Sequence, residues 1–174
     1  QLEMYTGNER SQEKFFTKEK GSKKPNSFKF GWTWRKRRGT GEREYDPIKK
    51  MYKSKAMQDN PWLLDMFKEY SNNYFPNFEW SEIQINHMPE GCRTKEHLDK
   101  VNVGDSILIA FGDYQGGRTY VKNKNDKNYE IHDARFNPLQ FNGAERKHGV
   151  TSVTSGDRFS LVFYQSKERE IEPY

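Results

Sequence analysis

The sequence predicts a mainly β protein, built as a sandwich, a barrel or a jelly roll. From about residue 78 onward, many short apolar or alternating segments follow one another, and turn residues separate them. A parallel α/β fold is disfavoured because no helix-length segment lies between these strands. The length of 174 residues fits one domain, and no internal repeat is visible.

Composition indicates a folded domain with polar flanks. Hydrophobic residues make up only 32% of the chain, but aromatic residues reach 15%, whereas disordered chains are poor in aromatics. No apolar run approaches the length of a membrane span and no signal-peptide core is visible, so we expect no membrane partner. The single Cys92 excludes an internal disulfide and a multi-cysteine zinc site, which allows a reducing compartment.

Positive charge is concentrated in one part of the chain. Between Lys14 and Lys55 there are 15 Lys and Arg against 4 Asp and Glu, although the net charge of the whole chain is +5. A basic segment beside a slightly acidic body favours a polyanionic partner. The alternative is a solvated and partly disordered tail.

The N-terminal part combines a polar segment with an aromatic and basic one. Residues 1–27 show no sustained period and predict loop or disorder, with a short helix around Ser11–Lys18. Residues 28–34 alternate aromatic and other side chains, which predicts a strand. A basic run follows, and residues 39–41 form a flexible loop; aromatics beside such a run suit nucleic-acid binding. The alternative, compatible with the first, is a core strand followed by solvent-facing basic side chains, Arg35, Lys36, Arg37 and Arg38.

A helix is expected to begin at Asp59-Asn60-Pro61, where a capping residue precedes a proline at the first helical position. Apolar residues follow at spacings of three and four, so we expect this stripe to lie in the core. The helix should end near residues 71–73. The stripe consists of Trp62, Leu63, Met66, Phe67 and Tyr70.

Strands are expected over the rest of the chain. The continuous apolar run at residues 106–111 predicts a buried strand, and residues 88–95 predict a loop. Residues 112–117 and 122–128 predict a turn and a polar hairpin loop. The other expected strands span residues 78–86, 118–121, 129–132, 138–141, 147–153 and 158–165.

His97 and Asp99 form an HxD pair that can bind one metal ion. In an extended segment, residues i and i+2 share a face. His148 is the best candidate for a third ligand, because two histidines and one carboxylate form the facial triad of non-haem Fe(II) oxygenases. An HxD pair alone is a weak signal, since most such pairs are ordinary surface groups.

Arg158 and Ser160 follow the candidate ligand His148, after an expected turn at residues 155–157. Two strands far apart in sequence face each other inside a jelly roll, so one can present the HxD pair and the other His148. Arg158 then lies one strand beyond His148, where its guanidinium can anchor a dicarboxylate such as 2-oxoglutarate. Ser160 shares its face and adds a hydroxyl donor. A surface arginine is the alternative, but the apolar residues that follow favour partial burial.

These segments resemble the TET/J-binding-protein family of 2-oxoglutarate- and Fe(II)-dependent nucleic-acid dioxygenases. Residues 158–167, Arg-Phe-Ser-Leu-Val-Phe-Tyr-Gln-Ser-Lys, nearly repeat a segment of TET enzymes, and residues 97–102 match the family's HxDxxN motif. Residues 112–117 and 28–38 are similar to those of small fungal, algal and viral members. The resemblance covers residues 27–167.

The resemblance implies a double-stranded β-helix, or jelly roll, with an N-terminal helical and basic extension. It implies one dioxygenase domain at residues 28–167, between a polar segment (1–27) and a tail (168–174). It also implies two cofactors, Fe(II) and 2-oxoglutarate. The implied metal ligands are His97, Asp99 and His148; the implied 2-oxoglutarate contacts are Arg158 and Ser160, with Arg93 and Asn86 as weaker candidates; the implied base contacts are Asn102 and Tyr164.

Two departures from the TET pattern concern the substrate. Ser166 stands where TET enzymes carry a histidine that contacts the base, which leaves the choice between cytosine and thymine open. The cysteine-rich zinc region of animal TET proteins is absent from this sequence. We therefore expect a minimal catalytic domain of microbial or viral type.

The implied reaction is the oxidation of 5-methylcytosine in double-stranded DNA to 5-hydroxymethylcytosine or beyond, with O2 as co-reactant and after base flipping. The first alternative is thymine hydroxylation, the second a protein prolyl hydroxylase, and the third an inactive DNA-binding module. We expect an intracellular monomer, in the nucleus or, for a viral gene, in the host cytoplasm. The DNA contacts are expected from Ser166 and from the basic residues Arg35, Arg37 and Arg38.

Overall fold

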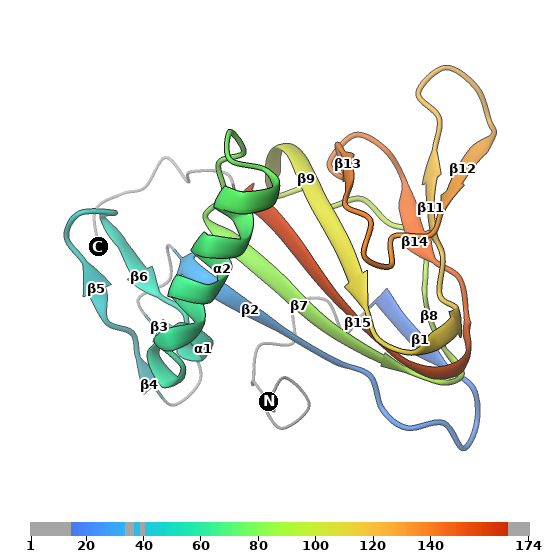
Figure 1. Ribbon diagram of the computed structural model, residues 1–174, viewed down its shortest axis with the longest axis horizontal. Coiled ribbons are helices and arrows are strands. Elements are labelled where there is room, and N and C mark those ends of the chain that lie inside the picture. Colours follow the sequence, from blue (N-terminus) through green and yellow to red (C-terminus); the bar gives the residue numbers. More distant parts are fainter. Residues whose placement is uncertain (1–14, 34–36, 39–40, 167–174) are drawn as a thin grey trace.

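Antiparallel strands dominate the architecture, as the sequence predicts. The computed structural model describes residues 15–33, 37–38 and 41–166, with the backbone alone at 37–38 and 41–42. One large sheet and one small sheet face each other, which is the jelly-roll arrangement (Figure 1). Within the described residues, neither helix has the length and hydropathy that a membrane-spanning helix requires.

The large sheet has the strand order β13-β9-β15-β7-β2-β6-β5, and β10 pairs with β15. All of its pairings are antiparallel. The central strand β15 lies between β9 and β7, so its backbone is hydrogen-bonded along both edges. The strands are β2 (Asn26–Thr33), β5 (Tyr45–Asp46), β6 (Met51–Lys53), β7 (Glu82–Pro89), β9 (Asn102–Phe111), β10 (Tyr114–Gly116), β13 (Leu139–Phe141) and β15 (Val153–Ser166).

The small sheet has the order β12-β11-β14, formed by β11 (Thr119–Lys122), β12 (Tyr129–His132) and β14 (His148–Val150). Two further pairs complete the described strands. Near the small sheet, β1 (Phe16–Lys18) pairs with β8 (Cys92–Thr94), and β3 (Arg37–Arg38) pairs with β4 (Gly41–Glu42) at the opposite end of the molecule (Figure 1).

Strict alternation along the central strands separates two cores. On β7, Ile83 and Ile85 face the helices, and on β15 Leu161 and Phe163 do the same. The intervening positions of these strands point toward the small sheet, because neighbouring residues of a strand face opposite sides. Residues 106–111 read as a continuous apolar run because both of their faces are covered. The second core is built from Met88, Cys92, Leu108, Ala110, Tyr114, Val121, Ala134, Phe141, Val150 and Val153.

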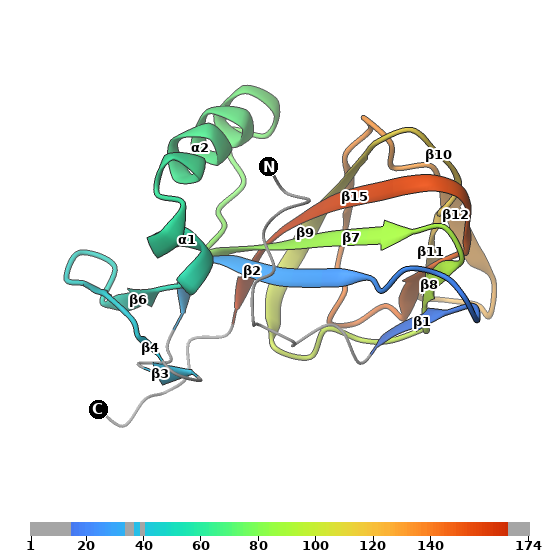
Figure 2. The ribbon, with the colours of Figure 1, turned by 90° about the horizontal axis from the view of Figure 1, so that it is seen from below.

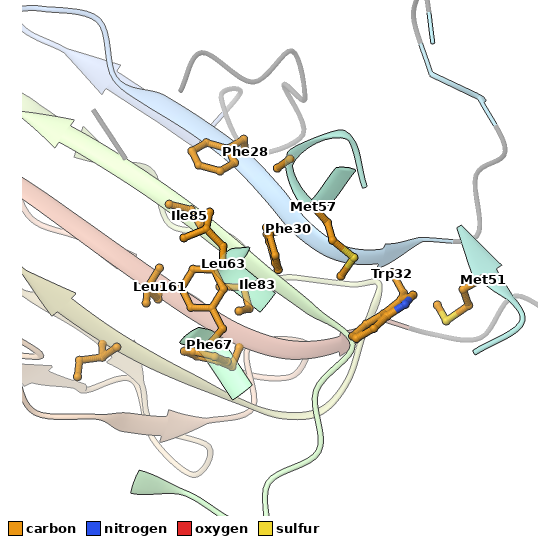
Figure 3. Close-up of a cluster of buried hydrophobic side chains, with 13 residues drawn as sticks. Phe28, Phe30, Trp32, Met51, Met57, Leu63, Phe67, Ile83, Ile85 and Leu161 are labelled. Carbon is orange, nitrogen blue, oxygen red and sulfur yellow. The ribbon is translucent and has the colours of Figure 1, made fainter. Parts of the chain in front are cut away.

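Helices α1 (Lys55–Asp59) and α2 (Trp62–Tyr74) cover the outer face of the large sheet (Figure 2). Phe67 of α2 packs edge-on against Phe30, with 5.1 Å between ring centroids, and against Phe163 at 6.3 Å. Figure 3 shows this apolar cluster between the helices and the strands. Burial of these aromatic rings, rather than helix propensity, holds such short helices in place.

The cap predicted for α2 is wrong by one residue. Pro61 is itself the N-cap, with no side-chain capping hydrogen bond. The Asn60 side chain instead donates to Ala56 O at 3.1 Å and closes α1, so it is not available to cap the next helix. The predicted apolar stripe is also only partly buried, since Trp62 and Met66 lie 49% and 45% exposed.

Several expected loops and turns contain strands, among them the turn at residues 112–117, which contains β10. Residues 16–18 form β1 within the segment predicted as loop or helix, because their backbone groups pair with β8; residues 11–14 lie outside the described part. β8 itself lies within the loop expected at residues 88–95, and β7 occupies residues 82–89 rather than 78–86. No turn interrupts residues 155–157, since Gly156 takes a φ of +75° and β15 continues through it beside β10.

Candidate metal and cosubstrate site

The structure brings the three predicted metal ligands together at the junction of the two sheets. His97 and His148 form an isolated antiparallel bridge, with N–H···O distances of 2.9 and 3.1 Å between their backbones. The backbone N–H of Asp99 donates to Gly143 O at 2.8 Å, which fixes the second half of the HxD pair. One ligand atom from each of the three side chains lies within 4.8 Å of the others.

Hydrogen bonds orient both imidazoles in the same way. The Nδ1 of His97 lies 2.7 Å from Lys95 O, and the Nδ1 of His148 lies 2.8 Å from Arg146 O. A carbonyl oxygen only accepts, so each Nδ1 carries a proton and the Nε2 atom of each ring is the one that can face a metal.

Both Nε2 atoms face the Asp99 carboxylate. The distance to His148 Nε2 is 3.0 Å and the distance to His97 Nε2 is 3.6 Å. A metal cation among these three groups satisfies two nitrogen lone pairs and one carboxylate at once. This donor set fits Fe(II), which binds two histidines and one carboxylate in a facial triad.

Gly143 leaves room for this cluster. A Cβ at this position would lie 3.1 Å from Asp99 Oδ2 and 3.0 Å from His148 Cε1. Its φ is not in the left-handed region, so alanine is compatible with the backbone there. A Cβ at this position would therefore press against two of the ligands, whereas the backbone conformation would accept it.

We expect Gly143→Ala to weaken Fe(II) binding by about 10-fold or more, since displaced ligands or their supports typically cost 10–100-fold in metal affinity. The thermal midpoint of the metal-free protein should change little. Equilibrium dialysis against Fe(II) under anaerobic conditions, with a melting curve of the metal-free protein, checks both parts. Unchanged metal affinity would show that the metal does not sit beside Gly143.

One pocket of about 610 Å³ includes the triad, Arg158 and Ser160 among its lining residues. This volume lies within the usual range for small-molecule sites. The three ligands lie on the side of β14 and the HxD segment, whereas Arg158 and Ser160 project from β15 of the large sheet. The predicted alternation is confirmed, because both β15 residues are buried on the inner face.

Arg158 is a buried cation without an ion-pair partner in the described part of the chain. It is 1% exposed, and its guanidinium hydrogen bonds reach only uncharged groups, Thr119 Oγ1 at 3.4 Å and Met88 Sδ at 3.8 Å. Its Nε has no partner among the described residues. Burial lowers the pKa of Arg158, and Tyr114 and Asp133 act in the opposite direction. Arginine nevertheless keeps its charge in proteins, so this site suits an incoming carboxylate.

The two weaker cosubstrate candidates have different surroundings. Asn86 lines the pocket and its Nδ2 lies 3.4 Å from Ser160 Oγ, while Ser27 Oγ donates to its Oδ1 at 2.7 Å. Arg93 is exposed on β8, does not line the pocket, and donates from Nε to Thr17 Oγ1 at 3.0 Å. The structure therefore does not bring Arg93 to the cosubstrate region, because alternation on β8 directs it away from the buried Cys92.

The predicted base contacts are divided between two environments. Asn102 and Tyr164 line the same pocket as the triad. Ser166 does not line it, and its buried hydroxyl has no hydrogen-bond partner among the described residues. Arg37 and Arg38 form β3, but only their backbone is described, and Arg35 lies outside the described residues.

Two charged residues, one beside the pocket and one lining it, were not predicted from the sequence. Glu82 is 6% exposed and accepts a hydrogen bond from the Tyr164 hydroxyl. Lys29 lines the pocket and lies 3.9 Å from Glu82 and 5.9 Å from the Tyr164 ring centroid. The only available signal was the polar half of the alternation in β2 and β7, which looks the same whether it faces water or a polar pocket.

The remaining titratable candidates lie apart from this site. His87 pairs with Asp157 at 2.8 Å and His132 lies 3.1 Å from Glu130, and neither histidine lines the pocket. Cys92 is fully buried in the second core, where burial raises its thiol pKa.

The chain is similar in sequence to a Tet-like dioxygenase. No family model matches the chain. Tet-like dioxygenase 1 of Naegleria gruberi is 30% identical over 112 residues, which are 64% of this chain and 34% of that protein. The chain thus spans about one third of the length of this curated relative.

Two solved structures share the fold. A 2OG-Fe(II) oxygenase-family oxidoreductase from Burkholderia pseudomallei has a TM-score of 0.56 at 17% identity, covering 80% of this chain and 65% of its own. NgTET1 in complex with 5mC DNA has a TM-score of 0.51 at 18% identity, covering 85% of this chain and 63% of its own. At such identities the likeness shows only that this chain shares the jelly-roll fold of these oxygenases.

Proposed function

We propose that this TET-like 2-oxoglutarate- and Fe(II)-dependent dioxygenase oxidises 5-methylcytosine in DNA to 5-hydroxymethylcytosine. The observation that carries the proposal is the combination, in one pocket, of the His97–Asp99–His148 cluster with the buried guanidinium of Arg158. The named relative and the NgTET1 complex with 5mC DNA support the choice of substrate.

Different residues of the pocket would hold the iron, the 2-oxoglutarate and the target base. His97, Asp99 and His148 would hold the iron, and Arg158 with Ser160 would hold the distal carboxylate of 2-oxoglutarate. Together with O2, these cofactors supply the oxidising chemistry that hydroxylates a C–H bond and releases succinate and CO2. The protein itself positions the groups and keeps water away from them.

The base would enter from the end of the pocket that carries Asn102 and Tyr164. A methyl group inside a duplex is out of reach, so the nucleotide must be flipped into the pocket. The hydrogen bond from Tyr164 to Glu82 holds the phenol ring in place, which gives a flipped base a fixed surface to pack against. The amide of Asn102 offers both a donor and an acceptor to the base edge.

The basic segment at residues 35–38 is the proposed contact with the DNA backbone. It follows β2, and β2 also carries Lys29 into the pocket. A single strand therefore leads from the pocket to the basic segment. We propose that Arg35, Lys36, Arg37 and Arg38 bind phosphates rather than bases, which positions the duplex without reading its sequence.

The test compares methylated and unmethylated duplexes of one sequence, with nucleoside mass spectrometry of the products. We expect 5-hydroxymethylcytosine from the methylated duplex and little hydroxymethyluracil from either, because a polar group left unpaired by the wrong base costs orders of magnitude. The Asp99→Ala protein serves as the inactive control. Hydroxymethyluracil formed as fast as hydroxymethylcytosine would replace the proposal with thymine hydroxylation.

A further inference from the structure

The ring of Phe15 lies flat against the imidazole of His97. The ring centroids are 4.1 Å apart and the planes differ by 11°, which is a parallel stack. Phe15 directly precedes β1, whose residue Phe16 pairs with Thr94 of β8. Phe15 thus reaches the triad from the start of the described chain, more than eighty residues before the histidine that it covers.

The backbone of Lys95 links this phenylalanine to the metal ligand. Its N–H donates to Phe15 O at 2.8 Å, and its carbonyl lies 2.7 Å from His97 Nδ1. One residue therefore fixes both the main chain beneath the phenyl ring and the edge of the imidazole. The ring of His148 approaches His97 at 4.5 Å and 57°.

We infer that Phe15 is a positioning residue for His97, and that the pairing of β1 with β8 holds Phe15 in place. A hydrogen bond at Nδ1 fixes one atom of the imidazole but leaves the ring free to rock about that bond. A flat contact over the ring face removes this freedom, so the Nε2 lone pair stays directed at the metal. Phe15 also lines the pocket, so an apolar ring lies on that side of the ligand.

The chain contains a matched control for this stack. Phe159 lies against His87 with 4.6 Å between centroids and 9° between planes. The His87 side chain is 24% exposed and pairs with Asp157, and neither residue of this second stack lines the pocket. Removing each phenyl ring in turn shows whether an effect comes from the loss of any aromatic stack or only from the loss of the stack on the metal ligand.

The experiment measures Co(II) binding by the whole chain, using the visible absorption of the bound ion. Supports of metal-binding histidines typically contribute 10–100-fold to affinity, so we expect Phe15→Ala to weaken Co(II) binding about 10-fold and to change the absorption bands. Phe159→Ala should leave affinity and spectrum unchanged. Phe15→Tyr, which keeps the flat face, should restore both.

The inference rests on the proposed metal centre, and the outcomes distinguish the two. Absence of Co(II) binding by the unaltered protein would overturn the metal centre and the inference together. Normal binding by that protein with an unchanged affinity and spectrum in Phe15→Ala would overturn the inference alone. If Phe15→Ala fails to fold by its melting curve, Phe15→Leu replaces it, since leucine keeps the apolar cover without the flat face; unaltered Co(II) binding by Phe15→Leu then overturns the inference.

Discussion

Asp99→Ala is expected to abolish stoichiometric iron binding while leaving the fold intact. The two imidazoles that remain are only two of the three ligands of a facial triad, and the negative charge of the site is lost, since Asp99 is the single carboxylate in the cluster. The fold should persist because the bridge between His97 and His148 uses backbone groups that the substitution does not touch. Iron per chain, measured after anaerobic loading and desalting, reports the result.

His87→Ala is the control for this experiment. His87 also pairs with an aspartate, at 2.8 Å from Asp157, but it lies outside the pocket. Its replacement should leave iron content and turnover unchanged. Full iron occupancy in the double variant His97→Ala/Asp99→Ala would show that the metal is bound elsewhere.

Arg158→Met is expected to raise the apparent constant for 2-oxoglutarate far more than that for DNA. Loss of one partner from a buried, hydrogen-bonded charge pair costs about 2–5 kcal/mol, which corresponds to roughly 30-fold to several thousand-fold in binding. Turnover measured against each ligand in turn gives both constants. Equal effects on the two ligands would contradict the assignment of Arg158 to the cosubstrate.

The same substitution should not destabilise the protein without its ligands. Arg158 is buried with uncharged partners only, and replacing a buried charge by an apolar side chain of similar length is often neutral or stabilising. The thermal midpoint of Arg158→Met should therefore equal or exceed that of the unaltered protein. Arg93→Ala, which changes an exposed arginine outside the pocket, should alter neither the 2-oxoglutarate constant nor the DNA constant.

Much of the jelly roll could be predicted because its strands obey simple alternation. Ile83 and Ile85 mark one face of β7, and the continuous run in β9 marks a strand covered on both sides. The HxD pair and the arginine ten residues after His148 sufficed to predict the cluster that the structure brings together.

The parts that could not be predicted depend on contacts between distant segments. Phe15 precedes a strand of three residues, too short for any period, and only pairing with β8 places its ring on His97. Glu82 occupies a polar position of an alternating strand, which a sequence alone assigns to solvent. Asn60 was expected to cap α2, but it closes α1 instead, and local spacing does not decide between two adjacent helix ends.

The spacing of two pocket residues on strand β15 limits the insertions and deletions that this strand can tolerate. Arg158 and Tyr164 project from it toward the same pocket, six residues apart, and a regular strand makes that separation about 20 Å. Losing or gaining one residue between them would turn one of the two side chains to the helix-covered face, since alternation reverses at every step. Point changes between these positions can be absorbed by repacking, whereas a one-codon deletion or insertion needs a compensating β-bulge to restore the alternation. Descendants of this gene should therefore keep the spacing from Arg158 to Tyr164 invariant even where the residues between them diverge.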